Sequence, residues 1–215
     1  MSKRVLITGG GSKFGYELTK RFSDNGYIVD VITSSNIVHE NVNVSIIKWS
    51  TITENKLKKA LDSFGSNEYD VIFFNHNTGG GPNETDYLPY TDYNIKKWSN
   101  HYFINCQIPF ITLKYIHSKV KHDTKIGWMI SGMVDGKWED GWKYGGYVGF
   151  KATNLYQMRG FSKYYPGIFF CMNPGHIELH NYEGDSSQII DTIQKLEKSD
   201  SGKILFKTGH QVSIT

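Results

Sequence analysis

The stretch that decides the fold is TGGGSKFG, residues 8–15. A short apolar run at 5–7 precedes it, and a helical pattern with apolar residues at 14, 18 and 22 follows it. A strand, a glycine-rich turn and a helix in this order can hold a pyrophosphate, because the turn and the helix N-terminus present backbone amides to an anion. The motif is irregular, since Ser12 or Lys13 stands where its middle glycine is expected.

We expect this loop to bind a dinucleotide, because neither substitution removes a backbone amide. A tight turn without a ligand is the alternative. Gly9 permits a tight turn out of the strand, Gly11 lets the backbone approach an anion, and Gly15 allows close packing of the helix. Lys13 could add a cation beside a phosphate. The candidate cofactor-binding residues of the loop are Gly9, Gly11, Ser12, Lys13, Phe14 and Gly15.

Strand and helix patterns alternate along the rest of the chain. Strands are expected at 5–8, 27–33, 43–49, 69–75, 126–131, 168–172 and 203–207, and helices at 14–25, 53–64, 95–120, 146–164 and 187–198. This alternation implies right-handed crossovers and a parallel sheet covered on both faces. The sequence therefore predicts one α/β domain over 1–215, with a doubly wound, Rossmann-like parallel sheet of about seven strands in three αβα layers.

Composition narrows the class of protein. The chain has 215 residues and 39% hydrophobic residues, which suits one globular domain with a full core. The net charge of +3 comes from scattered lysines, so no nucleic-acid partner is expected. No apolar run reaches the roughly 18 residues of a membrane span, and the N-terminus has no signal-peptide pattern. Cys106 and Cys171 lie in apolar settings and are expected to be reduced core residues of a cytoplasmic protein.

A second motif is YVGFK, residues 147–151, which places Tyr147 and Lys151 on one face of a predicted helix. Such a pair is common and by itself would be a surface pair. Here it follows Ser131, at the end of a predicted strand, by 16 residues, and Asn105 lies in the middle of the preceding long helix.

Together with the glycine loop, these residues make the chain resemble the short-chain dehydrogenase/reductase family over nearly its whole length. By that resemblance, the catalytic candidates are Tyr147, Lys151, Ser131 and Asn105. Residues 77–79 match part of the family's asparagine signature after the fourth strand, with His76 where its first asparagine stands, and 173–175 match the segment that covers the nicotinamide. The further cofactor-binding candidates are Asn77, Gly79, Lys151, Pro174, Gly175 and Ile177.

The resemblance implies an NAD(P)-dependent oxidoreductase acting on a small carbonyl or alcohol. Hydride transfer leaves charge on the substrate oxygen, so Tyr147 would exchange a proton with that oxygen. The ammonium of Lys151 would lower the pKa of the phenol and hold the nicotinamide ribose. Ser131 would orient the substrate oxygen, and Asn105 would hold a water that links Lys151 to solvent.

The end of the second strand bears on the choice of cofactor. It ends with Thr33, Ser34 and Ser35, and it offers no carboxylate for the 2′-hydroxyl of NAD. The hydroxyls of Ser34 and Ser35 could bind a 2′-phosphate, and Lys13 could neutralise it. NADP(H) is therefore favoured over NAD(H).

Several alternatives stay open. A non-catalytic dinucleotide-binding or regulatory protein of the same fold would share the loop. A different register would put Gly132, which has no hydroxyl, at the serine position. His176 and His180 resemble metal ligands, but they follow Pro174 and Gly175, so no metal is expected. The resemblance further implies a homodimer or homotetramer and no membrane partner.

Overall fold

The computed structural model describes residues 2–77, 94–131, 134, 145–175, 182–209 and 211–212. These residues form an eight-stranded sheet in the order β3-β2-β1-β4-β5-β6-β7-β8, in which β1 to β7 run parallel and β8 runs antiparallel to β7. The strands are β1 (Arg4–Thr8), β2 (Ile28–Thr33), β3 (Val42–Ile46), β4 (Tyr69–Phe74), β5 (Val120–Met129), β6 (Ile168–Asn173), β7 (Lys203–Phe206) and β8 (Gln211–Val212).

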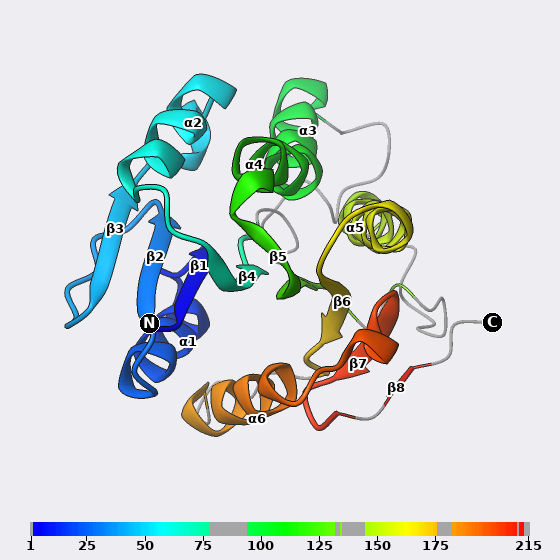
Figure 1. The fold of residues 1–215 in the computed structure, drawn as a ribbon. Coiled ribbons are helices and arrows are strands. Elements are labelled where there is room, and N and C mark those ends of the chain that lie inside the picture. The colour runs from blue at the N-terminus through cyan, green and yellow to red at the C-terminus, as the bar shows by residue number, and fades with distance from the viewer. Residues whose placement is uncertain are drawn as a thin grey trace.

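The predicted doubly wound parallel sheet is confirmed, and the helices cover both of its faces (Figure 1). The first face carries α1 (Lys13–Asp24) and α6 (Tyr182–Gln194), and the second carries α2 (Glu54–Ser63), α3 (Ile95–Tyr102), α4 (Ile108–Ile116) and α5 (Gly145–Tyr164). The strand order reverses between β1 and β4, so the ligand crevice of such a fold lies beyond the carboxyl ends of these strands. No helix in the described part of the chain is long and apolar enough to cross a membrane.

Two capping residues explain where helices begin. The Ser12 hydroxyl accepts a hydrogen bond from the Gly15 amide at 3.0 Å, and the Thr53 hydroxyl accepts one from the Lys56 amide at 3.3 Å. Such caps satisfy amides that a first helical turn leaves without a partner. The beginning of α2 just after Thr53 agrees with the prediction from the sequence.

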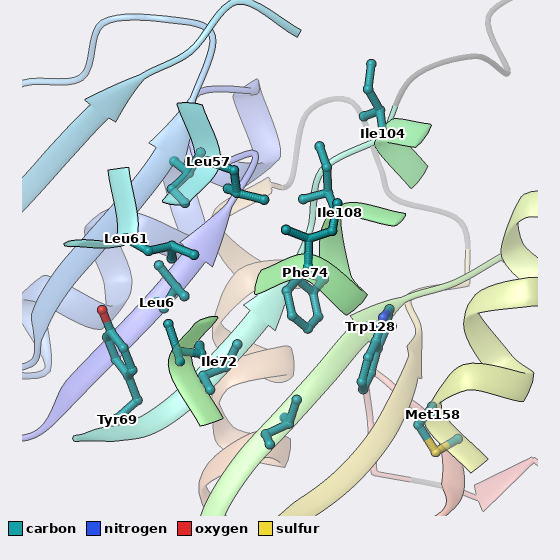
Figure 2. Packing of buried hydrophobic residues seen from close by; sticks show 14 of the residues in the cluster. Leu6, Leu57, Leu61, Tyr69, Ile72, Phe74, Ile104, Ile108, Trp128 and Met158 are labelled. Carbon is teal, nitrogen blue, oxygen red and sulfur yellow. The ribbon is translucent and has the colours of Figure 1, made fainter. Parts of the chain in front are cut away.

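The sheet divides the core into two clusters. One lies under α2, α4 and α5 and contains Leu57, Ile108 and Met158, packed on Phe74 and Trp128 of the strands (Figure 2). The other lies under α1 and α6. Its buried residues are Val5, Ile7, Phe14, Leu18, Phe22, Tyr27, Val29, Val31, Ile37, Val71, Phe73, Met129, Ile168, Phe170, Met172, Ile189, Ile190, Ile193, Leu196 and Leu205. Burial on both faces explains why the central strands are apolar at nearly every position.

The predicted long helix over 95–120 is interrupted in the structure. Residues Phe103–Gln107 form a π-helical turn between α3 and α4, in which the Ile108 amide donates to the carbonyl of Phe103. Pro109 follows and has no amide hydrogen, so the regular hydrogen-bond ladder cannot continue through this position. A π turn of this kind widens the helix locally, and it contains the candidate residue Asn105.

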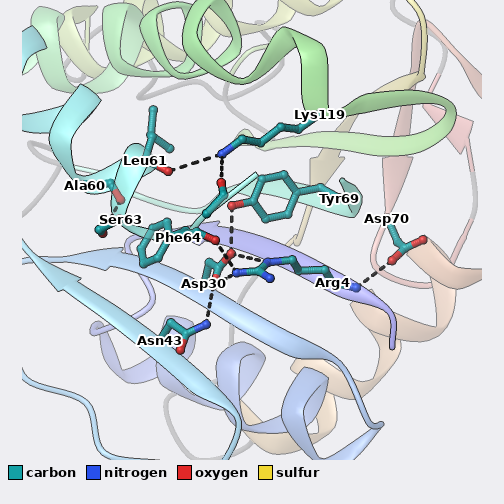
Figure 3. Close-up of polar contacts among 11 residues, drawn as sticks. Arg4, Asp30, Asn43, Ala60, Leu61, Ser63, Phe64, Tyr69, Asp70 and Lys119 are labelled. Atoms are coloured by element: carbon teal, nitrogen blue, oxygen red, sulfur yellow. Dashed lines mark hydrogen bonds and ion pairs between the residues drawn. The ribbon is translucent and has the colours of Figure 1, made fainter. Parts of the chain in front are cut away.

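The amino end of the sheet holds a buried ionic network (Figure 3). Arg4 donates to both carboxylate oxygens of Asp30, at 2.7 and 3.0 Å, and to the carbonyl of Phe64 at 2.7 Å. The Tyr69 hydroxyl donates to Asp30 at 2.9 Å, and the Asn43 amide donates to it at 2.8 Å. The Asp30 carboxylate is therefore bound to residues at the end of the sheet opposite the glycine loop.

Candidate active site

The glycine loop packs against the ends of β2 and β4, the two strands that flank β1 in the sheet. Gly9 has φ +76°, and a Cβ placed on it would lie 2.5 Å from the Cα of His76, just after β4. A Cβ on Gly11 would lie 2.2 Å from the Thr33 hydroxyl of β2, and one on Gly15 would lie 2.2 Å from the Gly9 carbonyl. Glycine is thus required at all three positions by close contacts within the protein.

The other loop candidates differ in exposure. Phe14 is buried in the core, whereas Ser12 and Lys13 are exposed. Ser34 and Ser35 are also exposed. The Ser35 amide donates to the Thr33 hydroxyl at 3.2 Å, and a Cβ placed on Gly11 would lie 2.9 Å from the Ser35 Cβ. The described end of β2 therefore presents hydroxyl groups and no carboxylate beside the loop.

The structure brings Tyr147, Lys151 and Ser131 together at the carboxyl end of β5. The Ser131 hydroxyl forms a hydrogen bond with Tyr147. The Lys151 Nζ atom lies 5.6 Å from the centre of the Tyr147 ring and donates to the Met129 carbonyl at 2.9 Å. The pair four residues apart on α5 therefore faces the strand end that Ser131 follows.

Burial shifts the pKa values of both Lys151 and Tyr147. Lys151 is only 2% exposed, and desolvation lowers its pKa to about 8. Burial raises the pKa of Tyr147, and its hydrogen bond with Ser131 opposes that rise. The sequence predicts that Lys151 lowers the pKa of Tyr147. In the structure the pKa of Tyr147 is raised instead, because the effect of burial outweighs that of the hydrogen bond with Ser131.

Asn105 lies on the π turn beside α5, and it is buried. Its side-chain amide donates to the His101 carbonyl at 2.9 Å, within its own helix. The next residue, Cys106, donates from its thiol to the Phe150 carbonyl at 3.7 Å, directly before Lys151 in the chain. The π turn thus packs against the part of α5 that carries the lysine.

Comparison with known proteins identifies the fold. No protein-family model and no curated protein matches the sequence. A carbonyl reductase from Pseudomonas aeruginosa PAO1 superposes with a TM-score of 0.82 at 12% identity, over 98% of this chain and 99% of that chain. A double mutant of a Serratia marcescens short-chain dehydrogenase/reductase gives a TM-score of 0.79 at 13% identity, over 95% of each chain.

A third structure is a protein from Burkholderia multivorans, provisionally assigned as a short-chain dehydrogenase/reductase and solved with bound NADP. It superposes with a TM-score of 0.79 at 16% identity, over 99% of each chain. The chain has the short-chain dehydrogenase/reductase fold.

The remaining candidates that the structure describes, Asn77, Pro174 and Gly175, follow β4 and β6 at the carboxyl end of the sheet. Asn77 is exposed after β4, and Pro174 is buried after β6. Gly175 has φ +64°, and its amide donates to the Asn173 side chain at 3.0 Å. The predicted residues Gly79 and Ile177, the alternative Gly132 and the histidines at 176 and 180 lie outside the described residues.

His76 is a site residue that the sequence reasoning passed over as a departure from the asparagine signature. Its Nδ1 atom is hydrogen-bonded to the Thr8 hydroxyl, and its Nε2 atom lies 2.8 Å from the Ile104 carbonyl on the π turn. Burial, and then the charge of Lys151, lower the pKa of His76 to about 3, so the ring is neutral. The sequence carried one signal that could have found it, an imidazole at a position where the family signature has an amide.

Proposed function

We propose that the chain is a short-chain dehydrogenase/reductase that transfers a hydride between NAD(P) and a small carbonyl or alcohol substrate. The observation that carries this proposal is the buried ammonium of Lys151. Among the described residues no carboxylate pairs with it, although burying an unpaired charge is costly. An ionisable group held in this way at the crevice of an α/β fold is typical of a functional site.

The residues present fit a dinucleotide. An ammonium has three donors, and the described structure gives Lys151 one acceptor, the Met129 carbonyl, so its other donors suit the hydroxyls of a ribose. The tight loop that contains Gly9 and Gly11 would hold the pyrophosphate, with Gly15 at the start of α1. Pro174 and Gly175 would border the nicotinamide, which would supply or accept the hydride when bound.

The side chains of the site then handle the proton. Tyr147 would donate its hydroxyl proton to a substrate oxygen during reduction and accept it back during oxidation. Ser131, already hydrogen-bonded to Tyr147, would orient that oxygen. Lys151 would stabilise the phenolate because its positive charge lies beside the ring. Asn105 would hold a water that connects Lys151 to solvent.

Two exposed serines and a lysine support a preference for NADP(H). Ser34 and Ser35 follow β2 beside the loop that contains Lys13, and the described end of β2 has no carboxylate to repel a 2′-phosphate. The Burkholderia multivorans protein of similar fold was solved with NADP. NADPH should therefore have a lower KM than NADH. Ser35→Asp should reverse the preference by repelling the phosphate, whereas Ser63→Asp, on the distant α2, should leave it unchanged.

The test of the whole proposal is turnover. The chain is incubated with NADPH or NADH and a panel of aldehydes and ketones, and consumption of the reduced cofactor is followed by absorbance. Tyr147→Phe should lower kcat about 10²- to 10⁴-fold, the usual range for loss of a general acid. Tyr156→Phe, at an exposed tyrosine of the same helix, is the matched control.

The second candidate is a dinucleotide-binding protein without catalysis. It is favoured by the raised pKa of Tyr147, which disfavours the phenolate, and by the bond that engages Lys151 with Met129. This alternative predicts binding of NADP(H) by calorimetry without turnover on any carbonyl compound. A measured rate that is lost in Tyr147→Phe excludes it.

A homo-oligomer formed through α4 and α5 completes the proposal. Phe110, Tyr164 and Tyr165 are exposed there, and Phe110 and Tyr165 also line a cavity of about 460 Å³. Light scattering should therefore give at least a dimer, and Phe110→Asp should yield monomers. A monomeric wild type would contradict the proposed oligomer.

The free, buried Cys106 and Cys171 fit a reducing compartment, and we place the protein in the cytoplasm.

A further inference from the structure

The carbonyl of Ile104 has no amide partner within its helix. In a regular α-helix it would accept from Ile108, but that amide donates to Phe103 in the π turn. In a π register it would accept from Pro109, which has no amide hydrogen. Since Ile104 is fully buried, its carbonyl needs a donor from elsewhere in the fold.

His76 is that donor. Its Nε2 atom lies 2.8 Å from the Ile104 oxygen. A carbonyl can only accept, so Nε2 carries the ring proton and Nδ1 is the acceptor. The Thr8 hydroxyl must then donate to Nδ1. One chain of hydrogen bonds therefore runs from the end of β1, through the residue after β4, to the π turn.

The surroundings hold the imidazole in this position. His76 is 5% exposed. The centre of its ring lies 5.7 Å from that of Trp49 and 6.3 Å from that of Phe74, the latter in an edge contact. Gly9 packs directly on the His76 backbone, so a side chain at position 9 would displace it. The ring is thus fixed between the glycine loop and the π turn.

We infer that His76 is a positioning residue that fixes the Asn105 turn relative to the glycine loop and Lys151. It does so by donating to the buried carbonyl of Ile104, which neither the Ile108 amide nor Pro109 satisfies. This role deepens the proposed function and rests on it only for its catalytic consequence. The hydrogen-bond arrangement itself is a property of the protein without substrate or cofactor.

The chain allows closely matched variants. In His76→Gln, the side-chain Nε2 is as many bonds from Cβ as the imidazole Nε2, so it can still donate to Ile104. His76→Phe keeps a ring of similar size and removes both hydrogen bonds. Thr8→Val is nearly isosteric and removes only the donor to Nδ1, leaving Nε2 in place.

The first experiment needs no turnover. Long-range proton–nitrogen NMR should show wild-type His76 protonated at Nε2, and Thr8→Val should shift population toward the Nδ1-protonated tautomer. Hydrogen exchange of the Ile108 amide, which donates to Phe103 in the π turn, should accelerate about tenfold in His76→Phe, because the hydrogen bond from position 76 to Ile104 is lost. The exchange rate should stay near that of the wild type in His76→Gln, which keeps this hydrogen bond. A wild-type ring protonated at Nδ1 overturns the inference, even if His76→Phe does not fold.

The second experiment separates positioning from packing. His76→Phe should lower kcat about tenfold with an unchanged dissociation constant for NADPH, and His76→Gln should recover most of that loss. Equal losses in both variants overturn the inference, because the ring would then serve only to fill space. If the wild type shows no turnover at all, the proposed function fails, while the tautomer and exchange results still decide the role of His76.

Pro109→Ala supplies a further check. The new amide at position 109 can reach the Ile104 carbonyl in the π register. The effect of His76→Phe on Ile108 exchange should therefore be smaller in the Pro109→Ala background. Fully additive effects would show that the two residues do not share this carbonyl, which contradicts the inference.

Discussion

Two buried cations at opposite ends of the sheet have very different partners. Arg4 at the amino end is 8% exposed, and it bonds both oxygens of Asp30 and the Phe64 carbonyl. Lys151 at the carboxyl end is 2% exposed, and among the described residues Met129 supplies the acceptor to its ammonium. Arg4 has a carboxylate matched to its guanidinium (Figure 3), whereas Lys151 lies beside a tyrosine ring and two thiols.

The difference separates a structural cation from a functional one. A guanidinium that is paired with a buried carboxylate has its charge already balanced within the protein, so it has little to gain from an anionic ligand. A lysine that is buried without a carboxylate is destabilised in its charged form, and hydrogen bonds to a hydroxyl-rich ligand would stabilise that form. The two ends of the sheet should therefore respond in opposite directions to removal of their charge.

Removal of the Arg4 charge should give the largest change in stability. Arg4→Met leaves the Asp30 carboxylate buried without its counter-ion, so the free energy of unfolding should fall by about 3–5 kcal/mol. Urea denaturation measures this, with Lys59→Met at an exposed position of α2 as the control. A loss below about 1 kcal/mol would mean that the network is far weaker than its geometry suggests.

Removal of the Lys151 charge should instead stabilise the protein. The fall of its pKa from 10.5 to about 8 corresponds to roughly 3 kcal/mol at neutral pH, and loss of the bond to Met129 returns roughly 1 kcal/mol. Lys151→Met should thus gain roughly 2 kcal/mol while losing turnover. Lys163→Met, exposed on the same helix, controls for general effects of the substitution. A destabilised Lys151→Met would indicate that the ammonium is better satisfied than we infer.

The pH dependence of stability sharpens the same point. Between about pH 8 and 10.5 the unfolded chain keeps the lysine proton that the folded chain has released, so stability rises with pH. The expected slope is about 1.4 kcal/mol per pH unit, and it is absent below pH 8. Denaturation curves of the wild type and Lys151→Met should therefore converge in this window. Parallel curves would mean that Lys151 titrates at the same pH when folded and unfolded.

The smallest effect is expected at the rim of the Arg4 network. Asn43→Ala removes one hydrogen bond to Asp30, on an exposed side chain whose place water can take. The free energy of unfolding should fall by about 1 kcal/mol or less. The thermal midpoint measures this change, with Asn55→Ala on α2 as the control. A loss as large as that of Arg4→Met would show that Asn43, and not the arginine, is the main support of Asp30.

Much of the fold could be predicted because local signals and topology agree. The apolar runs and caps gave β1, β4, α1 and α2 within a residue or two, and alternation gave the parallel sheet. β5 begins at Val120 and not at 126, since the polar residues from 121 to 125 resemble the end of a helix. In the structure Val120 pairs with β4, and after a shift of register Lys125 pairs with both β4 and β6. β8 was missed because Gln211–Val212 is too short to give a pattern.

The site was predictable where it repeats a motif and not where it depends on contacts between distant elements. The four-residue spacing of Tyr147 and Lys151 indicated a shared face, and their approach to Ser131 follows from the end of β5. The π turn required combining Pro109 with a histidine 33 residues earlier in the chain, which no local pattern encodes. The raised pKa of Tyr147 likewise depends on burial that only the packed structure defines.

The division of the core by the sheet has a practical consequence for engineering. Tyr147 and Lys151 come from α5 and Asn105 from the π turn, all on one side of the sheet, whereas α1 and α6 cover the other side. Fluorescent labels, affinity handles or cavity-filling substitutions on α6 would be insulated from the chemistry by a full layer of strands. Their energetic effects should add to those of changes around the lysine, which makes α6 the natural place to attach a probe.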